Sequence, residues 1–379
     1  MDENTNGNQP TAPQGPPRQV VTRSTNAPEP APDSTPQRPA APAEESVGPV
    51  EPTAQVGSGY VPSVPLHELQ AAVAKVRAEV RKVIIGQERM MDLLMIALLS
   101  DGHVLIEGAP GLAKTLTAKL LAKAVRTDFS RIQFTPDLMP SDVIGTSVFD
   151  PRTTAFEFRP GPIFSNIVLV DEINRAPAKT QAALFEVMEE RQITADGTTH
   201  AMGKPFMIVA TQNPIEQEGT YRLPEAQLDR FFFKIEIGYP SVVEEAAILM
   251  RYSSGSEHLS TAAVQPVLSP AELDNARKLA RAVRCEEKLV RYIAALVDQT
   301  RNDHALMLGA SPRASIAILM GAKSAAAIDG RDFVTPEDIR FVLPHVLRHR
   351  IMLTPEREME GLTPDNVIDR LVQKIDVPR

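Results

Sequence analysis

Five short apolar runs, separated by stretches with helical periodicity, constrain the fold of this chain more than any other feature. They are His103–Glu107, Arg131–Phe134, Ile167–Val170, Phe206–Ala210 and Phe231–Ile237. Short apolar runs that alternate with helical segments are typical of buried strands in a largely parallel sheet. The sequence therefore predicts an α/β core with a mainly parallel sheet of five strands.

The pattern changes at Tyr239-Pro240, beyond which no strand signal occurs. The remaining residues have helical patterns over roughly 241–253, 270–283, 286–301, 312–328, 335–347 and 365–375. We therefore expect an α/β nucleotide-binding core at residues 66–238, followed by a small all-α lid domain at residues 239–379.

The first 65 residues differ in composition from the rest of the chain. They hold 14 of the 33 prolines, and three arginines against seven acidic residues. Such a segment cannot bury enough apolar surface to offset the entropy of ordering it. We expect a disordered, Pro-rich acidic tail over residues 1–65, acting as a passive spacer; docking onto an aromatic groove of a partner is the alternative.

Charge and cysteine content exclude several classes of protein. The net charge is −8 and no basic tract occurs, so we expect no nucleic-acid partner. Cys285 is the only cysteine, which rules out a disulfide framework or a cysteine zinc site within the chain. No apolar run is long enough to span a membrane, and the first residues do not resemble a secretory signal. We expect a cytoplasmic protein with no direct membrane insertion.

A glycine-containing loop connects the first predicted strand to a helix that begins near Leu116. Gly108 and Gly111 allow the backbone to curl so that several N–H groups converge on one anion. Lys114 supplies a mobile positive charge for the outer phosphates, and Thr115 offers a hydroxyl group to Mg²⁺. The predicted phosphate-binding residues are Gly108, Ala109, Pro110, Gly111, Leu112, Ala113, Lys114, Thr115 and Leu116.

Ala113 stands where the strict phosphate-loop pattern has glycine. A methyl group is tolerated there only if the backbone keeps a negative φ, so the loop pattern alone does not decide the assignment. Taken alone, the loop also fits a plain strand–turn–helix connection.

Two carboxylates follow the buried run Ile167–Val170 directly. Ligands of open α/β sheets bind at the carboxyl ends of the strands, where Asp171 and Glu172 would lie. Asp171 fits direct or indirect Mg²⁺ binding, and Glu172 fits the base that polarises an attacking water. Helix capping by Asp171 is the alternative, and the phosphate loop upstream argues against it.

A third polar group follows the run Phe206–Ala210, which continues into Thr211-Gln212-Asn213-Pro214. Asn213 would lie at the same sheet edge as Lys114 and Asp171. A neutral amide there orients water and holds a γ-phosphate oxygen without adding charge. The alternative is an ordinary Asn-Pro turn.

Two arginines complete the candidate site. Arg230 directly precedes the last strand, at the opposite rim from the phosphates of its own chain, so it would reach a nucleotide only across a subunit boundary. An ion pair with Asp229 or Glu225 is the alternative role. Ser311-Pro312 reads as a helix start, which puts Arg313 in the first turn, where a cation opposes the helix dipole. An anionic partner such as a terminal phosphate would remove that conflict.

Taken in this order, the motifs resemble those of AAA+ P-loop ATPases over essentially all of residues 66–379. Four longer sequence motifs are similar to those of the MoxR family, whose phosphate loop commonly carries alanine before the lysine. Arg222 stands where that family usually has proline. These motifs are Gly108–Thr115, Asp171–Pro177, Ala210–Pro214 with Ile215–Gly219, and Leu223–Phe231. By this resemblance Lys114, Asp171, Glu172, Asn213, Arg230 and Arg313 take the roles given above, and Ile85, Gly86 and Gln87 lie beside the adenine. Whether Arg313 acts on its own nucleotide or on a neighbour's stays open.

The resemblance also implies cofactors and partners. The implied cofactors are ATP and Mg²⁺, and the implied assembly is a homo-oligomeric ring of six chains. The implied role is that of a chaperone-like factor that remodels or matures protein complexes, with a partner that has a von Willebrand A domain and is often membrane-anchored. The second candidate function is the ATPase subunit of a metal chelatase. A nucleic-acid motor and a nucleotide-gated scaffold fit the sequence less well. Two predicted hairpins, at residues 145–159 and 190–202, would face the channel of the ring and touch the substrate, with surface decoration as the alternative.

Overall fold

The computed structural model describes residues 64–195, 197–213, 221, 223–253 and 261–378. Nearly all of the predicted tail therefore lies outside the described residues, as do Pro214, Ile215–Gly219 and Arg222 of the motifs. The described residues belong to one compact unit.

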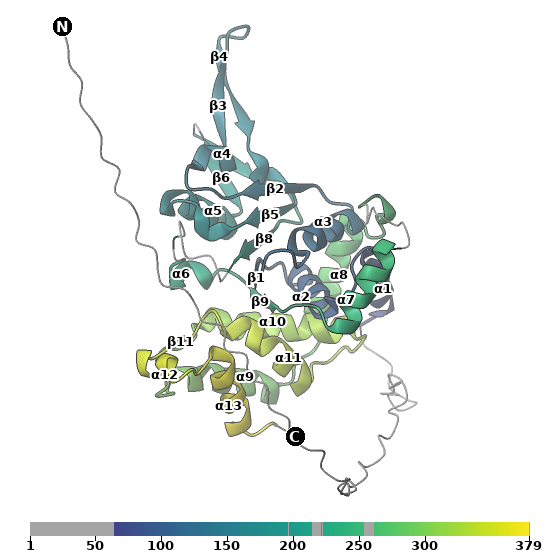
Figure 1. Cartoon of the computed structure of the whole chain (residues 1–379), viewed down its shortest axis with the longest axis vertical. Helices are drawn as coiled ribbons and strands as arrows, with labels where there is room; N and C mark the ends of the chain where they lie inside the picture. The colour runs from purple at the N-terminus through teal and green to yellow at the C-terminus, as the bar shows by residue number, and fades with distance from the viewer. Residues whose placement is uncertain (1–63, 196, 214–220, 222, 254–260, 379) are drawn as a thin grey trace, which may run out of the picture. The chain divides into compact units, whose positions relative to one another are not determined.

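Five parallel strands form the central sheet, in the spatial order β2-β5-β8-β1-β9 (Figure 1). Their bounds are Val104–Gly108 for β1, Phe129–Gln133 for β2, Ile167–Asp171 for β5, Met207–Gln212 for β8 and Phe233–Ile237 for β9. The five predicted strands are confirmed, each within two residues. Because all five run in the same direction, their carboxyl ends share one edge of the sheet.

The sheet is buried on both faces, which explains why its strands read as continuous apolar runs. Successive side chains alternate between two hydrophobic clusters: Val104 and Ile106 join one, and Leu105 joins the other. The first cluster includes α1 (His67–Arg81), α2 (Glu88–Leu99) and α3 (Lys114–Ala124). The second includes α5 (Ala178–Glu190); α4 (Pro140–Ile144) and α6 (Glu225–Leu228) are short.

The residues after β9 are mainly helical, and the six predicted helical stretches are confirmed. The helices are α7 (Val242–Ser253), α8 (Pro270–Ala282), α9 (Glu287–Arg301), α10 (Pro312–Ile328), α11 (Pro336–Leu347), α12 (Pro355–Met359) and α13 (Pro364–Lys374). Five of them begin with Ser-Pro or Thr-Pro, in which the φ of the proline suits the first turn. In α8 and α13 the side chain before the proline also accepts a backbone N–H of the first turn. A short antiparallel sheet of β10 (Leu306–Leu308) and β11 (Met352–Leu353) is not predicted by the sequence, so the lid is not purely helical.

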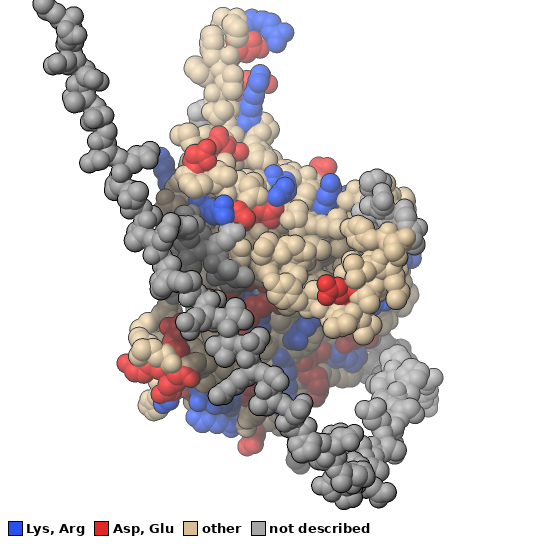
Figure 2. All heavy atoms as spheres, in the orientation of Figure 1, with Lys and Arg blue, Asp and Glu red and all other residues tan. Residues whose placement is uncertain are grey.

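Helix α7 differs from the other long helices because none of its described residues is buried. Val242 and Val243 are each at least 80% exposed, and Leu249 and Met250 also face solvent. In Figure 2 the surface over α7 is mostly tan, with few charged side chains. An apolar surface of this kind in a folded protein commonly marks a contact with another molecule.

Both predicted hairpins are present. They pair β3 (Gly145–Asp150) with β4 (Ala155–Pro160) and β6 (Gln192–Ala195) with β7 (Thr198–Ala201). The first projects away from the central sheet (Figure 1) and carries two exposed phenylalanines, Phe149 and Phe156, in edge-to-face contact.

Three buried histidines make the stability of the fold depend on pH. Burial and the neighbouring Arg191 lower the pKa of His103 to about 3. Its Nδ1 accepts the Ile208 N–H at 2.9 Å, a bond that requires an unprotonated nitrogen. Burial also lowers the pKa of His345 to about 3 and holds that of His349 well below 6.5.

We expect the protein to lose stability as the pH falls from 7 to 6. The unfolded chain binds protons on these histidines near pH 6.5 whereas the folded chain does not, so stability is full above that pH and declines below it. The loss is about 0.7 kcal/mol per histidine, or about 2 kcal/mol for the three. Urea unfolding at the two pH values measures it, and equal midpoints would contradict the prediction.

Candidate functional site

The loop between β1 and α3 has the backbone geometry of an anion-binding loop. A Cβ on Gly108 would lie 2.8 Å from the carbonyl oxygen of Ile237 in the neighbouring strand, so only glycine fits there. Gly111 has a φ of +85°, which favours glycine. Helix α3 begins at Lys114, so its first free N–H groups lie in the loop. The Lys114 ammonium donates to the Gly108 carbonyl oxygen at 2.6 Å.

The backbone at Ala113 contradicts the expectation from the sequence. Ala113 has a φ of 58° and a ψ of 18°, in the left-handed region, so the premise that alanine is tolerated there only at a negative φ is wrong. Its carbonyl oxygen accepts both the N–H and the hydroxyl group of Thr117, which anchors this conformation to the first turn of α3. The loop therefore requires a left-handed residue before the lysine, and alanine occupies that position at a strain of about 1 kcal/mol.

Asp171 and Thr115, the residues predicted to bind the metal, lie together. The Thr115 hydroxyl is 3.3 and 3.4 Å from the two carboxylate oxygens of Asp171, which is buried at the end of β5. Asp171 also accepts the Thr211 hydroxyl at 3.0 Å and pairs with Arg131 at 2.6 Å. One hydroxyl and one carboxylate suit Mg²⁺, which takes its other ligands from phosphates and water. Within the described residues no cluster of three or more His, Cys, Asp or Glu side chains could form a self-contained metal site.

Glu172 lies at the same edge because the backbone turns sharply after β5. Successive strand residues point to opposite faces, but Glu172 has a φ of 56° and so departs from the strand. Its N–H donates to the Thr211 hydroxyl at 3.1 Å. Its carboxylate accepts from Gln133 at the end of β2, at 2.8 Å, and pairs with Arg175 at 3.2 Å. Left-handed backbone at a non-glycine residue is a feature that concentrates at functional sites.

Asn213 directly follows β8 and is buried. Strand β8 lies between β5 and β1, so Asn213 falls at the edge that carries Asp171 and the phosphate loop. The structure therefore brings together the predicted phosphate, metal, base and amide residues at the carboxyl edge of the sheet.

A cavity of about 340 Å³ opens beside the phosphate loop. Its walls comprise Gly111, Leu112, Ala113 and Leu116 of the loop, Ile85 and Gln87 of the predicted adenine region, and Ile248, Arg251 and Tyr252 of α7. A larger cavity, of about 750 Å³, lies against α11 and α13 and lacks phosphate-loop residues. Of the two cavities, only the smaller one adjoins the anion-binding loop.

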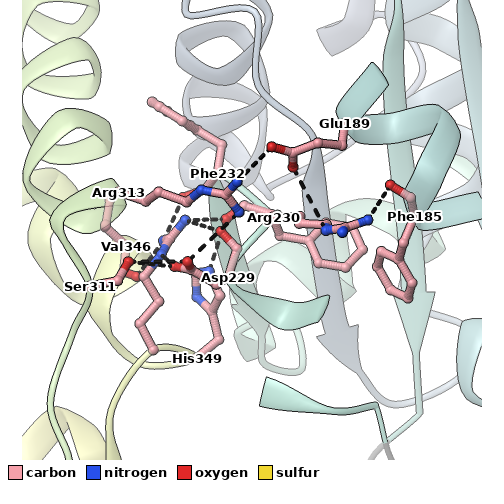
Figure 3. Close-up of polar contacts among 11 residues, drawn as sticks. Phe185, Glu189, Asp229, Arg230, Phe232, Ser311, Arg313, Val346 and His349 are labelled. Atoms are coloured by element: carbon pink, nitrogen blue, oxygen red, sulfur yellow. Dashed lines mark hydrogen bonds and ion pairs between the residues drawn. The ribbon is translucent and has the colours of Figure 1, made fainter. Parts of the chain in front are cut away.

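The two predicted arginines lie together, with Glu189 between them (Figure 3). Arg313 is in the first turn of α10 after the N-cap Ser311, as predicted. Its guanidinium pairs with Glu189 at 2.6 Å. Arg230 pairs with the same carboxylate at 3.7 Å and donates to the Phe185 carbonyl oxygen. Neither arginine is among the residues that line the 340 Å³ cavity.

Asp229 takes a different partner from the one considered in the sequence. It pairs with Arg350 at 2.8 Å and accepts the Ser311 hydroxyl at 3.1 Å. Arg350 also donates to the carbonyl oxygens of Phe231 and Val346. This network ties the segment before β9 to the lid.

Sequence reasoning missed Arg131, Thr211, Gln133, Glu189 and Arg350. Two of them carry a signal that was available: Thr211 is a polar residue at the end of an apolar strand run, and Glu189 is an acid at a helix C-terminus, where negative charge is unfavourable. The other three act through contacts across the fold, which no local pattern reveals.

Comparison with known proteins identifies the family of the chain. Residues 103–233 match the model of the ATPase family associated with various cellular activities (AAA), and residues 298–371 match the AAA lid domain. The chain is 43% identical to the YeaC protein of Bacillus subtilis over 82% of this chain and 96% of that protein. It is also 43% identical to the chaperone MoxR1 of Mycobacterium tuberculosis, over 83% of each chain.

More distant and structural similarities are consistent with these matches. The magnesium-chelatase 38 kDa subunit of Acidiphilium rubrum is 24% identical over 62% of this chain and 66% of its own. A crystal structure assigned as an ATPase of Cytophaga hutchinsonii superposes with a TM-score of 0.76, at 41% identity, and covers 82% of this chain and 97% of that one. The chain belongs to the MoxR family of AAA+ ATPases.

Proposed function

We propose that this ATPase works as a ring of six identical chains, in which each chain binds ATP and Mg²⁺ and its neighbour supplies Arg230 and Arg313. One observation carries the proposal: the arginines lie at the opposite edge of the sheet from the phosphate loop. Strands β1 and β9 run parallel, with Gly108 opposite Ile237 at the carboxyl end and Arg230 before the amino end of β9. An arginine that serves a nucleotide from that position must serve another chain's nucleotide.

Within one site, the chain's own residues have distinct tasks. Thr115 and Asp171 would hold Mg²⁺, which neutralises charge on the phosphates when bound. Glu172 polarises the attacking water, and Asn213 orients it. Lys114 leaves the Gly108 carbonyl oxygen for the outer phosphates.

The exposed apolar residues of α7 support assembly. Helix α7 lines the cavity beside the phosphate loop with one part of its surface and exposes Val242, Val243, Leu249 and Met250 on the rest. A neighbouring chain that brings arginines to this cavity would cover that surface. A head-to-tail contact of this kind closes into a ring when its rotation is right.

We further propose a chaperone-like role in remodelling or maturing protein complexes in the cytoplasm, with a von Willebrand A-domain protein as partner. The similarity to the chaperone MoxR1 supports this role. The projecting β3–β4 hairpin, with exposed Phe149 and Phe156, is the candidate client contact. No described helix is long and apolar enough to cross a membrane. Magnesium-chelatase subunits are more distant relatives, so a chelatase-like ATPase subunit is the second candidate.

Mixing two inactive variants tests the trans arrangement. Arg230→Ala chains keep an intact nucleotide site, and Glu172→Gln chains keep intact arginines, so we expect each alone to hydrolyse ATP poorly. In an equal mixture about one quarter of the sites combine both intact halves, and hydrolysis should recover to about that share. Phosphate release measures the recovery.

The same experiment with Arg313→Ala settles which nucleotide Arg313 serves. Recovery on mixing with Glu172→Gln places Arg313 in trans. No recovery with Arg313→Ala, alongside recovery with Arg230→Ala, places it in cis. If neither mixture recovers, the trans arrangement is wrong.

A further inference from the structure

Glu189 is the residue through which the two candidate arginines meet. One carboxylate oxygen lies 2.6 Å from Arg313 Nη2, and the other lies 3.7 Å from Arg230 Nε (Figure 3). Arg230 belongs to the core and Arg313 to the lid, so one side chain joins functional groups from two parts of the fold.

The placement of these charges is unfavourable within each helix and favourable between them. Glu189 is in the last turn of α5, where the helix dipole disfavours negative charge. Arg313 is in the first turn of α10, where the dipole disfavours positive charge. Their ion pair removes both conflicts, although neither residue suits its own helix.

Helix α5 is a rigid platform for this contact. Phe185 is buried in the core and lies one turn before Glu189, so the two residues share a helix face. Arg230 donates to the Phe185 carbonyl oxygen and pairs with Glu189, which fixes its guanidinium at two points on one helix.

The cluster still has capacity for an anion. Three arginines (Arg230, Arg313 and Arg350) and two carboxylates (Glu189 and Asp229, the latter 4.0 Å from Arg313) leave a net charge of +1. The side chains of Arg230 and Arg313 are 30% and 51% exposed, and each guanidinium has five N–H donors. An incoming phosphate can therefore bind the outer donors while Glu189 keeps the inner ones.

We propose that Glu189 is a positioning residue for hydrolysis in the neighbouring chain: it holds Arg230 and Arg313 side by side, so that both reach one terminal phosphate together. This role rests on the proposed trans function of the arginines. Holding charged groups in place before the reaction is what makes them effective in the transition state.

The test replaces Glu189 with glutamine, which keeps the size and removes the charge. We expect kcat for ATP hydrolysis to fall about 10-fold or more, because displacement of catalytic groups by 1 Å can cost about 100-fold. We expect KM for ATP to change less than about 2-fold, because the variant's own nucleotide site is at the other edge of the sheet. Glu186→Gln is the matched control, with the same charge change at an exposed position of the same helix, and should retain full activity. Glu189→Asp should fall between wild type and Glu189→Gln.

Mixing gives a readout that a purely structural role would not produce. Glu189→Gln chains mixed with Glu172→Gln chains should recover activity, because the second chain supplies well-positioned arginines to the first. Unchanged or increased kcat in Glu189→Gln, or equal losses in Glu189→Gln and Glu186→Gln, would overturn the positioning role. If Arg230→Ala and Arg313→Ala also leave hydrolysis unchanged, the proposed trans function itself fails; if they lose activity while Glu189→Gln does not, only the role of Glu189 fails.

Discussion

Replacing Glu172 with glutamine is expected to remove steady-state ATP hydrolysis by about 100-fold or more, while ATP binding is retained. An amide cannot accept the proton of the attacking water, so the catalytic loss follows from the chemistry of the group. The phosphate loop, the Thr115–Asp171 pair and the 340 Å³ cavity do not include Glu172, which is why binding should survive.

The fold should tolerate this substitution. Glutamine at position 172 can still accept the Gln133 amide N–H through its carbonyl oxygen. The lost ion pair with Arg175 is about one-third exposed on both sides, so it contributes little to stability.

Phosphate release together with binding of a fluorescent ATP analogue measures both halves of the prediction. The Glu186→Gln variant again serves as the charge-matched control. Phosphate release at the wild-type rate would remove Glu172 from the role of general base, and loss of nucleotide binding would show that its role is structural.

Replacing Asp229 with alanine is expected to lower the free energy of unfolding by about 3 kcal/mol. The Arg350 side chain is 3% exposed and pairs with Asp229 at 2.8 Å. Burial already lowers the pKa of Arg350, which shows that its charge is held against a desolvation cost. Without Asp229 that charge would stay buried and unpaired, and the Ser311 hydroxyl would also lose its acceptor.

Thermal or urea unfolding measures the loss. Asp274→Ala is the matched control, because Asp274 pairs with Lys278 on an exposed helix surface, and its removal should change stability by less than about 0.5 kcal/mol. A loss below about 1 kcal/mol in Asp229→Ala would mean that the carbonyl oxygens around Arg350 suffice to hold its charge.

The parts of the fold that the sequence predicts are those with a local cause. Strands buried on both faces produce continuous apolar runs. The Ser-Pro and Thr-Pro pairs of the lid predict where its helices begin. Strands β10 and β11 have three and two residues, too few to form a pattern. Their pairing depends on contact between segments that are far apart in the chain.

The same distinction between local and long-range causes applies to the candidate site. Lys114, Asp171, Glu172 and Asn213 could be placed at one edge because each follows or adjoins a strand in a parallel sheet. The left-handed backbone of Ala113 could not be predicted, because the family resemblance indicates which residue is common at that position but not which backbone conformation it adopts. Glu189 is 124 positions from Arg313, and their pairing follows only from how the lid packs on the core.

Asp229 and Arg230 are consecutive residues with partners in different directions. Asp229 binds lid residues, whereas Arg230 belongs to the pair proposed to serve the next chain. A rotation of the lid would therefore pull on the peptide unit that carries Arg230, and it would also move Arg313, which belongs to the lid; both movements link the lid to the neighbour's nucleotide. Such a link is directional: the lid position of each chain would affect the neighbour that its arginines serve, and not the neighbour on its other side. In the proposed ring, successive hydrolysis events would then travel one way around.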